Sequence, residues 1–126
     1  MTDQEILKYV HENNLSSYLN DTKWKKLVSA ITSDPNFNPP VNYKTIFDKE
    51  NNGDFSPVWW EELERDGFNI IEWLEIKPQK EEKTGKFTKP KVIDFTQFIQ
   101  NCLEENCINY SFENGIFKII GYYRAK

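Results

Sequence analysis

The segment Asn69–Lys77, which reads NIIEWLEIK, constrains the fold more than any other part of this chain. Successive side chains of a β-strand point to opposite faces, and both faces of this segment carry large apolar residues. Such a pattern is typical of a strand that lies inside a sheet and is covered on both sides. We therefore predict a central strand here, with the other elements arranged around it.

Two acidic residues, Glu72 and Glu75, interrupt this apolar segment. Because residues two apart share a face of a strand, Glu72 is predicted to lie beside Leu74 and Ile76. Glu75 then lies on the opposite face, beside Trp73. A buried carboxylate needs a charged partner or a raised pKa, and we expect one of the two acids to be buried. The favoured interpretation is a structural ion pair with one of three basic residues: Lys44, Lys118 or Arg124. The alternative is a small hydrolase in which Glu72 and Glu75 act as general acid and base across a cleft.

Apolar residues recur at helical spacing in three further stretches. Thr2 and Glu5 form a capping box for the first of them. The second stops at Pro35, because proline cannot continue a helix. The predicted helices begin at Asp3, at Asn20 or Asp21, and after Asp94, and a shorter helical segment runs from Val58 to Gly67.

The remaining segments complete an α+β fold. Asn114-Gly115 accepts the positive φ angles of a tight hairpin turn. The segment Pro78–Pro90 is rich in Lys and Glu, and we expect an exposed, mobile loop there. The other predicted strands are Asn42–Lys49, Ile108–Phe112 and Ile116–Tyr123. We predict a single domain over residues 1–126: a small, mostly antiparallel sheet of about four strands, with two N-terminal helices and one crossover helix packed on it.

Residues for catalysis or metal binding are sparse. His11 is the only histidine, and no ligand partner stands at helical spacing from it. Cys102 and Cys107 do not have the paired spacing of a zinc site, and no Gly-rich phosphate loop is present. We therefore expect no cofactor, no metal and no catalytic residue. The N-terminus lacks the pattern of a secretory signal and no segment is apolar enough to span a membrane, so we expect a cytoplasmic protein.

The charge of the chain favours a basic partner. The sequence has 20 acidic and 16 basic residues, which gives a net charge of −4. Nucleic-acid binding normally requires a basic face, and a basic stretch occurs only at Lys77–Lys91, so we do not expect direct nucleic-acid binding. A regulatory or nucleic-acid-associated module that uses this stretch is the third hypothesis, after a binding protein and a hydrolase.

The pair Trp59-Trp60 precedes an acidic helical segment. Adjacent residues on a helix point about 100° apart, so one tryptophan is predicted to enter the core while the other lies near the surface. An exposed aromatic residue with a charged rim is the composition of a protein-binding hot spot. The alternative is that both indoles belong to the core. The predicted partner-binding residues are Trp60, Glu61, Glu62, Glu64 and Asp66.

Three stretches together carry a resemblance to known proteins: Asn20–Trp24 (NDTKW), Ile71–Ile76 (IEWLEI) and Phe117–Arg124 (FKIIGYYR). In this order they resemble a family of small bacterial proteins classed as a domain of unknown function, over the span Leu15–Arg124. The family more often has a Trp-Tyr pair and a histidine where this chain has Phe55–Gly67. The resemblance implies bacterial origin and a common fold, and it transfers no functional residue.

In its size and acidity the chain is also similar, as a class, to the immunity proteins of bacterial toxin systems, which block a cognate toxin by direct binding. We therefore expect a bacterial protein-binding domain, an immunity-type inhibitor of a basic toxin domain such as a nuclease.

Overall fold

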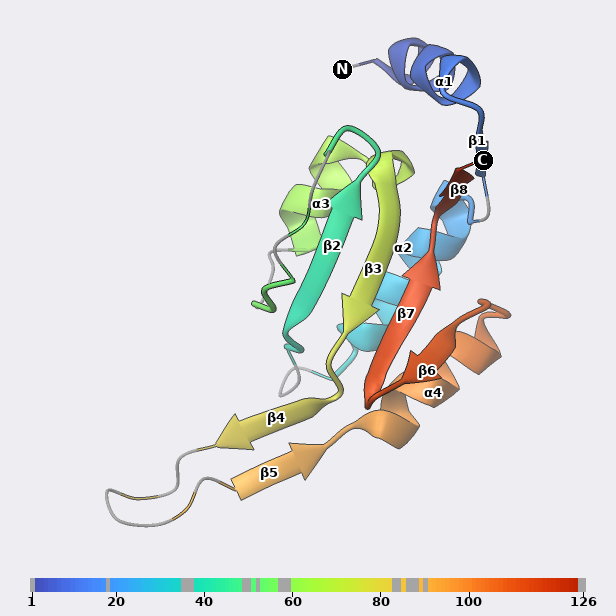
Figure 1. The fold of residues 1–126 in the computed structure, drawn as a ribbon. Helices are drawn as coiled ribbons and strands as arrows, with labels where there is room; N and C mark the ends of the chain where they lie inside the picture. Colours follow the sequence, from blue (N-terminus) through green and yellow to red (C-terminus); the bar gives the residue numbers. More distant parts are fainter. Residues whose placement is uncertain are drawn as a thin grey trace.

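A four-stranded antiparallel sheet forms the centre of the computed structural model, with the strand order β2-β3-β7-β6 (Figure 1). The structure describes residues 2–17, 19–34, 38–48, 51, 53–56, 60–82, 85, 89 and 91–124. The four strands are β2 (Val41–Thr45), β3 (Ile71–Ile76), β6 (Ser111–Glu113) and β7 (Ile116–Ile120). The α+β class and the interior position of the strand around Trp73 are therefore confirmed.

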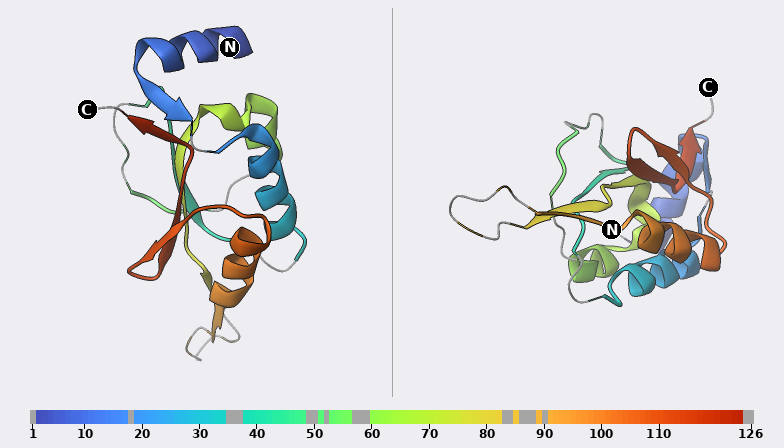
Figure 2. Two further views of the ribbon diagram at one scale, coloured as in Figure 1. Left: turned by 90° about the vertical axis from the view of Figure 1, so that its right-hand side faces the viewer. Right: turned by 90° about the horizontal axis from the view of Figure 1, so that it is seen from below.

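The described residues form four α-helices: α1 (Asp3–Glu12), α2 (Asp21–Ile31), α3 (Trp60–Asp66) and α4 (Thr96–Glu105). The Thr2 side chain accepts a hydrogen bond from the Glu5 amide, and the Asn20 side chain accepts one from the Lys23 amide. The first two helices therefore begin where predicted. The helices α2, α3 and α4 lie together on one face of the sheet (Figure 2). The described helices include none that is long and apolar enough to cross a membrane.

The main core fills the space between this face and the helices. Leu74 and Ile76 of β3 lie in it, and so does Phe68 of a 3₁₀ turn, Phe68–Ile70, that precedes β3. Trp73 and Glu75 alternate with them and remain partly exposed on the opposite face. The prediction that β3 is covered on both sides is therefore only half met.

Helix α1 stands apart from the other helices and packs into a smaller core. Ile6 of α1 contacts Leu15 and Ile46 there. Leu15 belongs to β1 (Leu15–Ser17), which pairs antiparallel with β8 (Tyr122–Arg124). This pairing fixes α1 beside the end of the chain (Figure 1).

Two sequence-based boundaries need correction. The segment expected to be a loop at 78–90 contributes a strand, since β4 (Gln79–Glu82) pairs with β5 (Lys91–Asp94). The strand expected to be continuous from 116 to 123 divides at Gly121 into β7 and β8. A Cβ atom at Gly121 would lie 2.2 Å from the backbone oxygen of Ile71, so only glycine fits where these backbones meet.

Candidate functional site

A β-bulge at the start of β3 determines which side chains reach the exposed face of the sheet. Lys44 of β2 opposes Trp73, but the next pair skips Glu72 and involves Ile71. The extra residue turns the Glu72 side chain to the face that carries Lys44, while Ile71 enters the core. The prediction that Glu72 shares a face with Leu74 is wrong, because a bulge breaks the two-residue alternation of the strand.

Glu72 is the buried acid of the pair, and Lys44 is its partner. The Lys44 ammonium donates a hydrogen bond to Oε2 of Glu72, and the two side chains are only 12% and 8% exposed. Of the three basic partners considered for a buried acid, Lys44 is therefore the one that forms the ion pair, and a purely structural role of the pair stays a prediction. Glu75 is partly exposed and accepts a 3.3 Å hydrogen bond from the Asn42 amide group.

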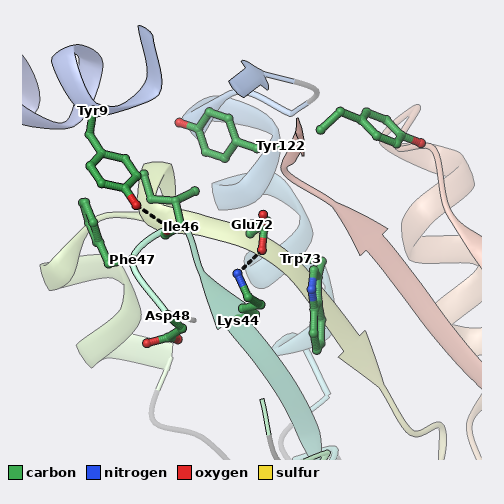
Figure 3. A pocket seen from close by; sticks show the side chains of 9 residues that line it. Tyr9, Lys44, Ile46, Phe47, Asp48, Glu72, Trp73 and Tyr122 are labelled. Atoms are coloured by element: carbon green, nitrogen blue, oxygen red, sulfur yellow. Dashed lines mark hydrogen bonds and ion pairs between the residues drawn. The ribbon is translucent and has the colours of Figure 1, made fainter. Parts of the chain in front are cut away.

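This ion pair forms part of an open pocket of about 590 Å³ on the face of the sheet opposite α2 and α4 (Figure 3). Four segments far apart in the sequence build it: helix α1, strand β2 with the turn after it, strand β3 and strand β8. Its lining consists of Tyr9, Lys44, Ile46, Phe47, Asp48, Glu72, Trp73, Tyr122 and Tyr123.

Hydrogen bonds and ring contacts hold the aromatic lining in place. The Tyr9 and Phe47 rings meet edge to face with centroids 4.6 Å apart. The Tyr9 hydroxyl donates to the Ile46 carbonyl at 3.2 Å, and the Tyr122 hydroxyl donates to the Asn69 carbonyl at 2.7 Å. Burial raises the pKa of Tyr122, so this hydroxyl remains a donor at neutral pH.

The chemistry of this lining bears on the hydrolase hypothesis. That hypothesis requires at least one of the two acids to project into a pocket. Glu72 lines the pocket, whereas Glu75 is absent from the lining. The described lining residues include no histidine, serine or cysteine. Among the described parts of the chain, no group of three or more His, Cys, Asp or Glu residues is arranged to hold a metal ion. Enzymatic use of Glu72 remains a prediction.

Helix α3 carries the predicted partner-binding residues, and one of them needs correction. Trp60 is 9% exposed and belongs to the main core together with Leu63. Its indole nitrogen is buried and has no hydrogen-bond partner among the described residues. Trp60 and Leu63 stand three residues apart on the face of α3 that docks on the core, so the indole is not available to a partner. Trp59 lies outside the described residues.

The acidic members of the set, Glu61, Glu62, Glu64 and Asp66, are all exposed on α3. Among the described residues, the one ion pair on this helix joins Arg65 to the Asp66 carboxylate at 3.9 Å. The negative charge of α3 also acts on Tyr43 of β2. The pKa of Tyr43 is raised, first by burial and further by the charges of Asp48, Asp66 and Glu62. The structure thus separates two regions, an acidic helix face and an aromatic pocket.

The aromatic pocket was not predicted from the sequence. Aromatic residues make up 15% of the chain, and this fraction alone does not distinguish rings that fill a core from rings that line a pocket. One local signal was available: Tyr122 and Tyr123 are adjacent on a strand, so at most one of them can point into the core. The basic stretch at 77–91 is described at residues 77–82, 85, 89 and 91, and its role remains a prediction.

Comparison with known proteins identifies one family. The model of a family of unknown function (DUF6678) matches residues 6–126. This match agrees with the resemblance carried by the three sequence stretches. No curated protein and no solved structure matches the chain.

Proposed function

The chain belongs to this family of unknown function, and we propose that it is a bacterial protein-binding domain, an immunity-type inhibitor that neutralises a basic toxin domain such as a nuclease by direct binding. The observation that carries the proposal is the row of exposed carboxylates on α3: Glu61, Glu62, Glu64 and Asp66.

These carboxylates stand on a firmly anchored helix. Trp60 and Leu63 bury one face of α3 in the main core, so the acids project from a platform that is ordered before binding. A preorganised surface pays less conformational entropy when a partner docks. The buried indole therefore supports the acidic surface from below, in place of the direct contact expected from the sequence.

The charge balance supports a basic partner. Glu61, Glu62 and Glu64 form no ion pair with a described residue, and the chain as a whole carries a net charge of −4. Complementary charges accelerate diffusional encounter more than they strengthen the final complex. Rapid capture of a basic toxin is the property that such a surface provides.

The test begins with co-expression of the tagged chain and the products of its neighbouring genes. We expect a basic protein that is toxic when expressed alone and harmless with this chain. Its affinity and association rate are then measured for a variant with Glu61, Glu62 and Glu64 changed to Lys. A matched control changes three exposed acids elsewhere, Glu12, Glu105 and Glu113, to Lys, with the same change in net charge.

The α3 variant is expected to slow association by roughly tenfold or more at low salt, whereas the control has a smaller effect. Equal effects of the two variants would show attraction by net charge alone and reject α3 as the contact surface. Unchanged binding of both variants would reject an electrostatic contact altogether. If no neighbouring product is toxic, the immunity assignment itself fails.

A hydrolase remains the second candidate because Glu72 lines the pocket. It predicts turnover of a chromogenic substrate panel that is lost in Glu72→Gln. An absence of turnover across glycoside and ester panels would remove it.

A further inference from the structure

We infer that the pocket between α1, β2, β3 and β8 binds a guanidinium group, supplied by an arginine side chain of a protein partner. The source of the arginine rests on the proposed function, whereas the recognition of the guanidinium rests on the pocket alone. Three independent properties of the described lining support this assignment: its acceptors, its charge and its rings.

The polar groups of the pocket are mainly hydrogen-bond acceptors. The hydroxyl hydrogens of Tyr9 and Tyr122 are directed to backbone carbonyls, so the two hydroxyl oxygens are left to accept. Asp48 accepts one hydrogen bond from the Thr45 amide through Oδ2, at 3.0 Å, and Oδ1 receives none from a described residue. A guanidinium group has five N–H donors and no acceptor, so it complements such a lining.

The charge of the lining is one unit negative. Asp48 and Glu72 are carboxylates, and Lys44 is the single cation among the lining residues. The Lys44 ammonium is already engaged by Glu72 and by the Thr45 carbonyl. Asp48 is exposed at the edge of the pocket, and its charge is the one that an incoming cation neutralises.

The walls of the pocket are aromatic. Five rings line it, those of Tyr9, Phe47, Trp73, Tyr122 and Tyr123. Arginine stacks its planar head on such rings, and a cation over an aromatic face is attracted by the ring quadrupole. The sheet itself gives an example, since the Lys118 ammonium lies 4.7 Å from the centre of the Trp73 ring. The volume of about 590 Å³ falls within the range of ligand pockets and accommodates one arginine side chain with its backbone.

The test uses Nα-acetyl-arginine amide as the probe and Nα-acetyl-citrulline amide as its neutral counterpart of nearly the same shape. Binding is followed by NMR through the indole N–H of Trp73 and the amides of residues 46–48. We expect saturable shifts with the arginine probe and affinity at least roughly tenfold lower for the citrulline probe. Because no partner protein is needed, the result does not depend on whether the proposed function is correct.

Asp48→Asn removes the charge and keeps an oxygen that accepts from the Thr45 amide, and Glu113→Gln makes the same charge change on β6 at the far edge of the sheet. We expect Asp48→Asn to weaken arginine binding by roughly tenfold and Glu113→Gln to leave it unchanged. Equal shifts with the two probes, or no shifts at the pocket, would overturn the inference even if the α3 variant confirmed the proposed function.

Discussion

Replacing Lys44 by methionine tests the role of the buried ion pair most directly. The substitution keeps the length of the side chain and removes its charge, which leaves the carboxylate of Glu72 without its partner at a site where that side chain is 8% exposed. Removing one partner of a buried ion pair typically costs about 3–5 kcal/mol, mainly because the other charge remains desolvated. We expect about 3 kcal/mol, the lower end of that range, because the pair lines an open pocket.

This cost corresponds to a large fall in melting temperature. Unfolding entropy of roughly 2.1 cal/mol/K per residue gives about 260 cal/mol/K for a chain of 126 residues. A loss of about 3 kcal/mol then lowers the Tm by about 11 °C. Lys118→Met is the matched control, because Lys118 lies on β7, next to β3, and its ammonium has no ion pair with a described residue and lies over the Trp73 ring. We expect it to cost at most about 1 kcal/mol.

The double variant Lys44→Met/Glu72→Leu separates desolvation from simple loss of contacts. With both charges removed, the site becomes apolar, and we expect a free energy of unfolding within about 1 kcal/mol of the original protein. Urea unfolding of the original protein, the two single variants Lys44→Met and Glu72→Leu, and the double variant completes a double-mutant cycle. We expect a coupling energy of about 2 kcal/mol or more between the two residues. The reasoning is refuted if Lys44→Met costs less than about 1 kcal/mol, or if the two single costs add in the double variant.

Three further substitutions test the backbone, the caps and the pocket rim. Gly121→Ala is expected to lower the free energy of unfolding by at least about 4 kcal/mol, because its Cβ would meet the Ile71 carbonyl. Gly115→Ala, which has a φ of +77° and open space around it, is expected to cost about 1–2 kcal/mol. Thermal unfolding of both variants checks this order. Asn20→Ala removes the acceptor for the Lys23 amide, and we expect a loss of about 1 kcal/mol in urea unfolding, with Asn20→Asp near neutral. Because the pKa of Tyr122 is raised in the folded protein, the unfolded chain loses this phenolic proton first, and stability falls as the pH rises above about 10. The free energy of unfolding of Tyr122→Phe is expected to fall less steeply with pH. Identical slopes for the two proteins would contradict this.

The features that the sequence determined by itself are local ones. The apolar pattern around Trp73 was sufficient to predict an interior strand, and the side chains of Thr2 and Asn20 identified two helix starts. The dipeptide Asn114-Gly115 adopts the positive φ angles expected of it, 54° and 77°. Each of these depends on residues within a few positions of one another, so the physical cause is fully contained in a short window.

The tertiary structure decided the features that depend on contacts between distant segments. Only the pairing of β2 with β3 creates the bulge that turns Glu72 toward Lys44. Only the docking of α3 assigns Trp60 to the core and leaves its acidic neighbours outside.

The pocket has the same origin, because the pairing of β1 with β8 brings Tyr9 and Tyr122 to one rim. Strand register and helix docking are set by the packing of the whole core, and a one-residue shift in strand register reverses which side chains face solvent. For this reason a chain whose elements were largely predictable still had a candidate site that only the assembled fold could locate.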